Sequence, residues 1–305
     1  MLSSAVTSMD IRRLRYFLAV AERNNFTRAA ETLHLSQPSL SIQIAALEEE
    51  LGTPLFDRLG KHVALTQAGE ILREYAQRAL GELEQGARAI QELKGAERGR
   101  LIVGTLSTVN TYLIPPLVCR FKQRFPNVHL HLQAQPSAQI AADVVALRLD
   151  LGFCHLPAPT NRLAATPLFD ETLSLVTPRS FRLPGTRIRI RQLADLPLIL
   201  MPADYCLRKM IEGECAKAGV QPKVTIEMTS PEGILEAVKA GAGVTVLPEL
   251  YVRNRSADGA LRVVQLIDPV PRYRVGLVSL LGRYQDLVMK EFTQLCRATL
   301  DELRL

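Results

Sequence analysis

Apolar positions in residues 26–56 recur with the spacing of two short helices joined by a tight turn. The first predicted helix places Ala29, Ala30 and Leu33 on one face, and its two alanines allow a second helix to cross closely. The second predicted helix buries a stripe of large aliphatic residues: Leu40, Ile44, Leu47 and Leu51. Ser36 lies in the turn, where its hydroxyl can cap the second helix.

Short, uncharged polar side chains are predicted on the opposite face of this second helix, near its N-terminal end. They are Gln37, Ser39, Ser41 and Gln43. Pro38 suits the first helical turn. A helix-turn-helix contacts base edges and phosphates from this end of its second helix. The pattern favours a DNA-binding protein, and an ordinary buried helical pair with a polar outer face is the alternative.

Residues 67–94 have the heptad pattern of a long coiled-coil helix. Its apolar seam alternates spacings of four and three: Leu72, Ala76, Ala79, Leu83, Gly86, Ile90 and Leu93. Such a helix is roughly 42 Å long at 1.5 Å per residue. We expect it to pair with a second copy of the chain, which implies a dyad-symmetric operator with half-sites about one helical turn apart. Packing against its own chain is the alternative.

After the polar, glycine-flanked segment 95–100, predicted strands and helices alternate. Strands are expected at 101–106, 128–135 and 151–156, with helices at 111–126 and 137–150 between them. This order favours a mostly parallel sheet with helices on both faces. A second set begins with strands at 172–178 and 197–202 and indicates a second subdomain, from which residues 274–304 return to the first.

Residues 9–66 resemble the N-terminal domain of the LysR-type transcriptional regulators. The matching motifs are R-x-L-R-Y-F-L-A-V-A-E, F-T-R-A-A, S-Q-P-S-L-S, L-E-E-E-L-G, P-L-F-D-R and, at 65–69, L-T-Q-A-G. The resemblance implies a wing after the second helix, with Arg58, Lys61 and His62 as its cations for phosphate, and Arg28 lies near the reading edge. It also implies an activator that binds double-stranded DNA, forms a dimer or tetramer and contacts RNA polymerase.

The order of the C-terminal elements resembles the effector-binding domain of the same family, which has two lobes like a periplasmic binding protein. The predicted fold is therefore α/β overall, with a winged helix-turn-helix, a coiled-coil linker helix and a two-lobed α/β domain. The expected divisions are 9–66 for DNA binding, 67–94 for dimerisation, 95–100 for a hinge and 101–305 for effector binding. We expect lobe I at 101–168 plus 273–305, and lobe II at 169–272.

Effector contacts are expected where strands end, because open α/β sheets bind ligands there, against helix N-termini. Ser107 and Thr108 follow the first strand, at the loop where the family places inducer contacts, and Ser137 follows the second. Thr229 and Ser230 open a later helix, although a T-x-x-E capping box gives Thr229 a structural alternative. The expected effector is a small anion, because residues 98–305 carry 26 Lys plus Arg against 18 Asp plus Glu.

The segment CLRKMIEGEC, with Cys206 and Cys215, resembles the redox segment of the peroxide-sensing members of the family. There, two cysteines at this separation form a regulatory disulfide. Nine helical residues separate Cα atoms by about 13 Å, beyond the roughly 7 Å limit for a disulfide, so oxidation would have to unwind the helix. Tyr205 and Thr225 occupy positions where those sensors carry histidines, and Tyr205 is a candidate effector contact. The N-terminal half equally resembles the cyanate-operon type of regulator, which has no thiol pair.

Composition excludes several other classes of protein. The 305 residues are 47% apolar, without a window of 18 apolar residues or a signal peptide, so a cytoplasmic protein is expected without membrane attachment. The five cysteines form no C-x-x-C pair, so no structural metal is expected. No hydrolase, kinase or dinucleotide fingerprint is present, so neither catalysis nor a cofactor is expected. A solute-binding protein would leave the helix-turn-helix unexplained, and no role is assigned to residues 1–8.

Overall fold

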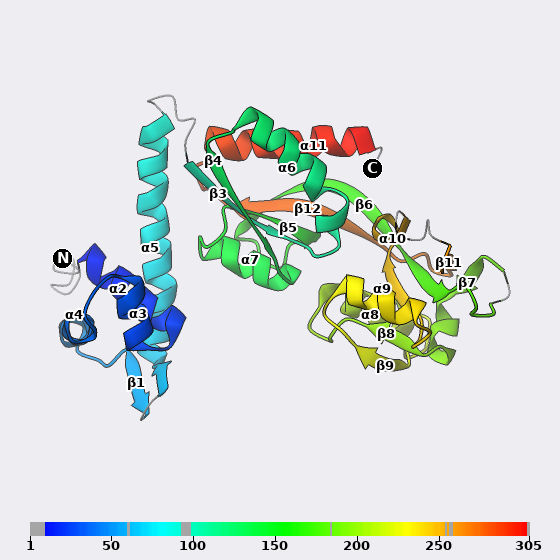
Figure 1. The fold of residues 1–305 in the computed structure, drawn as a ribbon, viewed down its shortest axis with the longest axis horizontal. Helices are drawn as coiled ribbons and strands as arrows, with labels where there is room; N and C mark the ends of the chain where they lie inside the picture. The colour runs from blue at the N-terminus through cyan, green and yellow to red at the C-terminus, as the bar shows by residue number, and fades with distance from the viewer. Residues whose placement is uncertain are drawn as a thin grey trace. The chain divides into compact units, whose positions relative to one another are not determined.

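The computed structural model describes residues 10–59, 62–92, 99–183, 185–253, 255 and 259–303. The chain divides into two compact units, residues 1–90 and 91–305 (Figure 1). Lys61, residues 95–98 of the expected hinge and Leu93 of the predicted seam lie outside the described residues. No described helix is long and apolar enough to cross a membrane.

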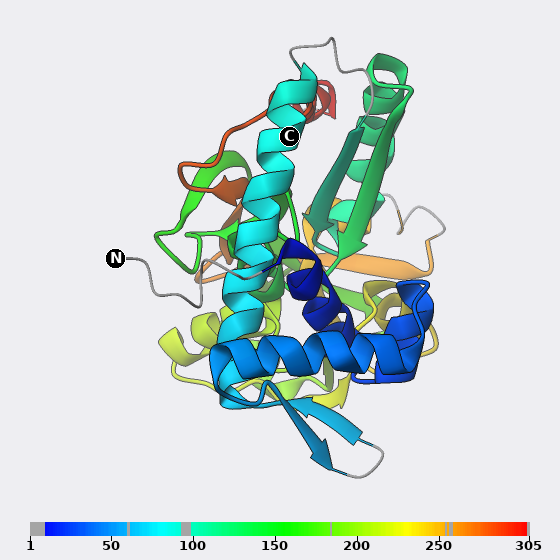
Figure 2. The same ribbon diagram turned by 90° about the vertical axis from the view of Figure 1, so that its left-hand side faces the viewer.

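The N-terminal unit is a small helical bundle followed by a hairpin and a long helix. Its elements are α2 Ile11–Arg23, α3 Phe26–Thr32, α4 Gln37–Leu51, β1 Phe56–Leu59, β2 His62–Leu65 and α5 Gln67–Glu92. The hairpin projects from the bundle in both ribbon views (Figure 2). The helix pair and its turn were predicted, because each helix begins at a polar cap: Asn25 for α3 and Ser36 for α4.

The family motifs around the hairpin contact one another. Thr66 donates its hydroxyl to the Pro54 carbonyl at 2.8 Å and accepts a hydrogen bond from the Gly69 N–H at 3.0 Å, which caps the start of α5. A Cβ at Gly69 would lie 2.2 Å from the Leu55 carbonyl oxygen. Only glycine fits where α5 comes this close to the residue before β1. This contact is the physical reason why L-T-Q-A-G, which contains Gly69, occurs together with P-L-F-D-R.

The predicted seam of α5 is covered at one end and open along the rest. Leu72 packs against the core of the bundle and Ala76 is buried. The described seam positions from Ala79 to Ile90 are exposed, with Leu83 54% and Ile90 60% accessible. The alternative that this helix packs on its own chain therefore holds only for its first three turns.

The C-terminal unit contains an eight-stranded sheet. Its strands are β3 Gly99–Thr105, β4 Val128–Ala134, β5 Leu151–Leu156, β6 Leu163–Pro178, β7 Arg187–Arg189, β10 Thr245–Pro248, β11 Leu261–Ile267 and β12 Arg272–Leu280. The order along the sheet is β4-β3-β5-β12-β6-β11-β7, and β10 also pairs with β6. A separate pair consists of β8 Leu198–Leu200 and β9 Val224–Glu227.

The expectation of a mostly parallel sheet is wrong. β12 runs antiparallel to β5 and β6, and β10 and β11 run antiparallel to β6. The parallel pairs are β3 with β4, β3 with β5, β11 with β7 and β8 with β9. The difference arises because β12, from far along the chain, inserts between β5 and β6 in the opposite direction.

Helices cover the sheet within this unit as the amphipathic patterns require. They are α6 Ile114–Arg124, α7 Ser137–Val145, α8 Cys206–Lys217, α9 Pro231–Lys239, α10 Glu249–Arg253 and α11 Leu287–Leu303, with short 3-10 turns η1 Val109–Thr111 and η2 Ile190–Asp195. In Figure 1, α6 and α11 lie on one side of the β3–β5 strands and α7 on the other. The helix expected to reach residue 150 ends at Val145, because Leu147 is left-handed and the Arg148 N–H returns to the Asp143 carbonyl.

Strand β6 is longer than expected and joins the two lobes. Its first part, to Thr172, pairs with β12 of lobe I, and residues 173–178 pair with β10 and β11 of lobe II. The expected division between residues 168 and 169 therefore falls inside one continuous strand. Figure 1 shows the two groups of elements at its two ends.

Candidate functional site

The polar residues predicted on α4 lie along two flanks of its exposed face. Gln37 donates to the Ser41 hydroxyl at 3.1 Å on one flank. Ser39 is bonded to the capping Ser36 hydroxyl on the other flank, and Gln43 follows it one turn later. The prediction of one polar face is therefore wrong in its centre, which Pro38, Ile42 and Ala45 occupy at the spacing of one helix face.

Charged residues on α2 and α4 fix the reading helix in place. Arg13 donates to the Gln43 side chain at 3.3 Å and forms an ion pair with Glu50 at 3.0 Å. Glu48 accepts hydrogen bonds from the backbone N–H groups of Leu55 and Phe56, at 2.8 and 3.2 Å. Glu50 thus holds α4 against α2, and Glu48 holds it against the residues at the start of the hairpin.

A surface notch beside α4 contains a cation that the sequence analysis left without a role. The notch has a volume of about 200 Å³ and is lined by Asp10, Arg12, Tyr16, Leu35, Ser39 and Gln43. Arg12 bonds to Asp10 at 3.2 Å, yet its side chain remains 77% exposed. A guanidinium beside a serine hydroxyl at a helix N-terminus suits a phosphate oxygen.

The remaining predicted DNA contacts are described less fully. Arg28 is exposed on α3, and its N–H donates to the capping Asn25 side chain at 3.0 Å. Arg58 lies in β1, opposite Val63, but its side chain and that of His62 are not among those described. Their roles as phosphate contacts stay predictions.

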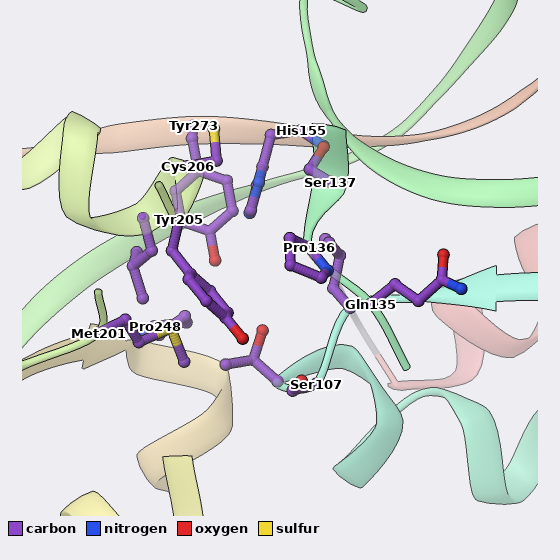
Figure 3. A pocket seen from close by; sticks show the side chains of 13 residues that line it. Ser107, Gln135, Pro136, Ser137, His155, Met201, Tyr205, Cys206, Pro248 and Tyr273 are labelled. Carbon is purple, nitrogen blue, oxygen red and sulfur yellow. The ribbon is translucent and has the colours of Figure 1, made fainter. Parts of the chain in front are cut away.

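A pocket in the C-terminal unit is lined from both lobes (Figure 3). Its cavity is small, about 30 Å³, or room for one or two water-sized groups. Its lining consists of Leu106, Ser107, Thr108, Gln135, Pro136, Ser137, His155, Met201, Tyr205, Cys206, Leu207, Pro248 and Tyr273. Four predicted effector contacts are among them: Ser107, Thr108, Ser137 and Tyr205.

Ser137 and His155 form the fixed wall of lobe I. The His155 N–H donates to the Ser137 hydroxyl at 3.1 Å, and the Cys154 thiol faces the Ser137 carbonyl at 3.6 Å. The His155 ring stands edge-on to Tyr273, with ring centres 4.9 Å apart. Burial lowers the pKa of His155 to about 4, so its ring is neutral at pH 7, and its Nδ1 has no partner among the residues that the structure describes.

Behind the pocket, a buried carboxyl joins two strands and the turn before α6. Glu171 of β6 accepts hydrogen bonds from the hydroxyls of Tyr273, at 2.7 Å, and Tyr112, at 3.1 Å. Burial raises the pKa of Glu171 to about 7, against the opposing effect of the two tyrosines. No sequence pattern predicted this cluster, because Glu171 and Tyr273 are 102 residues apart and meet only through the pairing of β6 with β12.

The pocket is electrically neutral. No Lys, Arg, Asp or Glu is among the described residues that line it. The excess of cations in this part of the chain is therefore not concentrated at the pocket; Arg208, for example, is held by Glu212 and Glu227. Among the described residues, no three metal-ligating side chains gather at one point.

Thr229 and Ser230 are exposed and do not line this pocket. Ser230, rather than the predicted Thr229, is the cap of α9, because its hydroxyl accepts the Gly233 N–H at 3.1 Å. The Ser230 hydroxyl, which was predicted to contact the effector, is therefore already bonded as a helix cap.

Cys206 and Cys215 lie on one continuous helix, α8, and both are free thiols. Cys206 is its first residue and lines the pocket, whereas Cys215 is buried. Burial raises the pKa of Cys206, partly offset by Lys209, and raises that of Cys215 to about 11. At 1.5 Å per residue they are about 13 Å apart along the axis, so a bond between them requires α8 to open.

The comparisons with known proteins agree with both units. Residues 11–70 match the bacterial regulatory helix-turn-helix protein model of the lysR family, and residues 94–301 match the LysR substrate binding domain model. A "Hydrogen peroxide-inducible genes activator" of Pectobacterium carotovorum subsp. carotovorum is 33% identical, covering 92% of this chain and 94% of that protein.

A second relative and one solved structure extend this likeness. The "DNA-binding transcriptional dual regulator OxyR" of Escherichia coli (strain K12) is 34% identical over 92% of this chain and 93% of that protein. A full-length OxyR variant of Pseudomonas aeruginosa has a similar structure, with a TM-score of 0.73 at 28% identity, covering 95% and 98% of the two chains. Two family models, one of which matches more than half of the chain, and relatives above 30% identity along nearly all of it place this chain in the LysR family of DNA-binding transcriptional regulators.

Proposed function

We propose that this regulator is an activator that works as an oligomer, whose geometry changes when a small molecule occupies the pocket between its lobes. The observation that carries the proposal is the origin of the pocket lining. Ser107, Thr108 and Ser137 come from lobe I, and Tyr205 and Cys206 from lobe II. A ligand that contacts both lobes favours one lobe arrangement over another, which is the requirement for a binding event to act at a distance.

The exposed part of the α5 seam supports the oligomer. Leu83 and Ile90 are large aliphatic residues on the outside of a helix that has left its own bundle. Pairing of two such seams would bury them and would bring two α4 helices to one operator. Contact with RNA polymerase is part of the same proposal and follows from the activator role alone.

The effector is a small polar molecule, and an anion remains the first candidate. Helices α7 and α8 begin at Ser137 and Cys206, which both line the pocket, so their N-terminal N–H groups supply the positive end of a dipole where no basic side chain does. The cavity of about 30 Å³ admits only a few heavy atoms unless the lobes separate.

The test exchanges one pocket hydroxyl for a methyl group. Thr108 is buried in the pocket wall and its side chain caps no helix, so Thr108→Val keeps shape while removing a hydrogen-bonding group. Thr229→Val is the matched control, exposed and outside the pocket. Thermal shift would be measured with cyanate, carbonate, acetate and other small anions.

An anion that stabilises the parent and the Thr229→Val variant should bind Thr108→Val about tenfold more weakly. Operator affinity without the anion should stay within about twofold of the parent. Stabilisation by none of these anions, or equal stabilisation of all three proteins, would remove the anion from the proposal.

A hydroperoxide is the second candidate signal, acting on Cys206. The specific observation is that the Cys206 thiol lines the pocket at the start of α8, and the Pectobacterium relative, at 33% identity, is named a hydrogen peroxide-inducible genes activator. Oxidation of two thiols to a disulfide reduces one hydrogen peroxide to two waters. The raised pKa values of both thiols and the intact α8 weigh against it.

Peptide mapping separates the two signals. Reduced full-length protein would be treated with stoichiometric hydrogen peroxide, with Cys119→Ser as the control because Cys119 is an exposed thiol elsewhere. A reversible Cys206–Cys215 bond that forms in both proteins would establish the redox switch. Unmodified or randomly oxidised thiols would eliminate it.

A further inference from the structure

Ile42 is the most exposed large hydrophobic side chain on the reading helix. It is 65% accessible, whereas Leu40, Ile44 and Leu47 on the same helix are fully buried. At 100° per residue, Ile42 lies about 160° from Leu40 and from Ile44, opposite the buried stripe. It therefore marks the centre of the face that α4 presents outward.

Ile42 is part of a stripe rather than an isolated exposed residue. Pro38 precedes it by one turn and Ala45 follows by one turn, and both are exposed. The pairs Gln37–Ser41 and Ser39–Gln43 border the stripe on either side. Glu49, also exposed, ends it one turn beyond Ala45, where a carboxylate would face the phosphates unfavourably. The outward face thus combines a narrow apolar centre with two polar edges.

The chemistry of the major groove limits what an aliphatic side chain can read there. Isoleucine neither donates nor accepts a hydrogen bond. The apolar group that base edges offer in the major groove is the thymine C5-methyl. A stripe of three apolar residues spans about 10 Å of helix, or about three base pairs.

We propose that Ile42 is a specificity-determining residue of this regulator, which recognises a thymine methyl group in each half-site of the operator. Gln37 and Ser39 on the two edges of α4 contact neighbouring base edges or phosphates, and the methyl contact lies between them. This inference rests on α4 as the reading helix and is independent of the effector.

The experiment first lets the protein choose its site. Full-length protein would select duplexes from a random pool, and each thymine of the selected site would then be replaced by uracil, which removes the C5-methyl alone. At one thymine per half-site, uracil should weaken binding by the parent about fourfold, the loss expected for one buried methyl-sized group. The Ile42→Ala variant should bind the thymine and uracil sites equally.

Conservative and control variants make the result specific to the side chain. Ile42→Val keeps a branched apolar side chain and should retain the preference for thymine over uracil. Binding to unrelated duplex should stay within about twofold for both variants, because phosphate contacts supply that affinity. Circular dichroism would verify folding, and a side chain this exposed can be shortened without opening a cavity.

Three outcomes would overturn the inference. The parent protein could tolerate uracil at every position, uracil could weaken the parent and Ile42→Ala equally, or no common sequence could emerge from selection. The first two would remove the role of Ile42 and leave α4 as the reading helix. The third would also remove the assignment of α4.

Discussion

The outward face of α4 and the pocket between the lobes present similar polar residues in opposite settings. On α4, the polar side chains are exposed and form hydrogen bonds with one another, such as Gln37 with Ser41. In the pocket, they are buried or half-buried and converge from segments far apart in sequence, and His155 Nδ1 has no partner among the described residues. A surface of the first kind is formed before its ligand arrives, whereas a site of the second kind is completed by its ligand.

This difference separates binding from stability. A substitution on the outward face of α4 changes the complex with DNA and leaves the free energy of unfolding nearly unchanged. A substitution at a buried residue in or behind the pocket, such as Thr108 or Glu171, changes both, because these side chains are also packed inside the folded domain. Four predictions test this contrast, in decreasing order of the expected effect.

Gly69→Ala should unfold the N-terminal unit at ordinary temperatures. The new Cβ would meet the Leu55 carbonyl oxygen at 2.2 Å, a backbone atom that cannot move aside, and we expect a loss of about 3 kcal/mol or more. Calorimetry should show one transition lost or lowered and the transition of the C-terminal unit unchanged. Gly86→Ala is the control: with open space at its Cβ, it should stabilise α5 by about 0.5–1 kcal/mol. A single transition that shifts as a whole would show that the two units unfold together.

Glu171→Gln should remove one loss of stability of the C-terminal unit at rising pH. Because burial raises the folded-state pKa of Glu171 to about 7, its contribution to stability is complete below pH 4.5 and is lost as pH rises through 7. The glutamine variant has no such loss, so its Tm should gain on the parent between pH 5 and pH 8. The Tm difference would be measured at each pH; a constant difference would mean that Glu171 is charged throughout.

Gln37→Ala should weaken binding to the selected operator about tenfold and leave folding unchanged. The exposed amide offers both a donor and an acceptor to a base edge, a contact worth about 1–3 kcal/mol. Fluorescence anisotropy on operator and unrelated duplexes would measure both affinities. Equal losses on both duplexes would place Gln37 on phosphate instead.

Arg12→Ala should produce the smallest change, about threefold on every duplex. An exposed cation in the notch beside Ser39 contacts phosphate, so its loss reduces the slope of log affinity against log salt by about one. Measuring affinity at several salt concentrations would distinguish a phosphate contact from a purely structural role. An unchanged slope would mean that Arg12 only completes the cap of α2 through Asp10.

The sequence predicted best what short-range rules determine. Ser36 caps α4 within three residues, so the start of the second helix was predicted correctly. Ser107, Thr108 and Ser137 follow strand ends, and that rule, together with the family resemblance for the first two, led to residues that line the pocket. Thr229 and Ser230 obeyed the same pattern of helix start, yet Ser230 serves as a cap. One motif cannot distinguish these two uses of a hydroxyl.

Long-range pairing accounts for what was missed. The long strand β6 and the insertion of β12 depend on residues about a hundred positions apart, and no local pattern records their direction. Glu171, Tyr273 and His155 became neighbours through that pairing alone. Ile42 was not predicted for another reason. Only polar side chains were considered as DNA contacts, whereas Ile42 is marked by being apolar and exposed.

Because β6 runs unbroken from one lobe into the other, the effector domain has no loose joint there. Neighbouring strands adopt a range of twist angles, roughly 10 to 35°. We therefore expect the lobes to move relative to each other by rotation about the strand axis. A ligand at the pocket would twist that strand. The change transmitted to the DNA-binding part of the oligomer would then be a rotation rather than a translation.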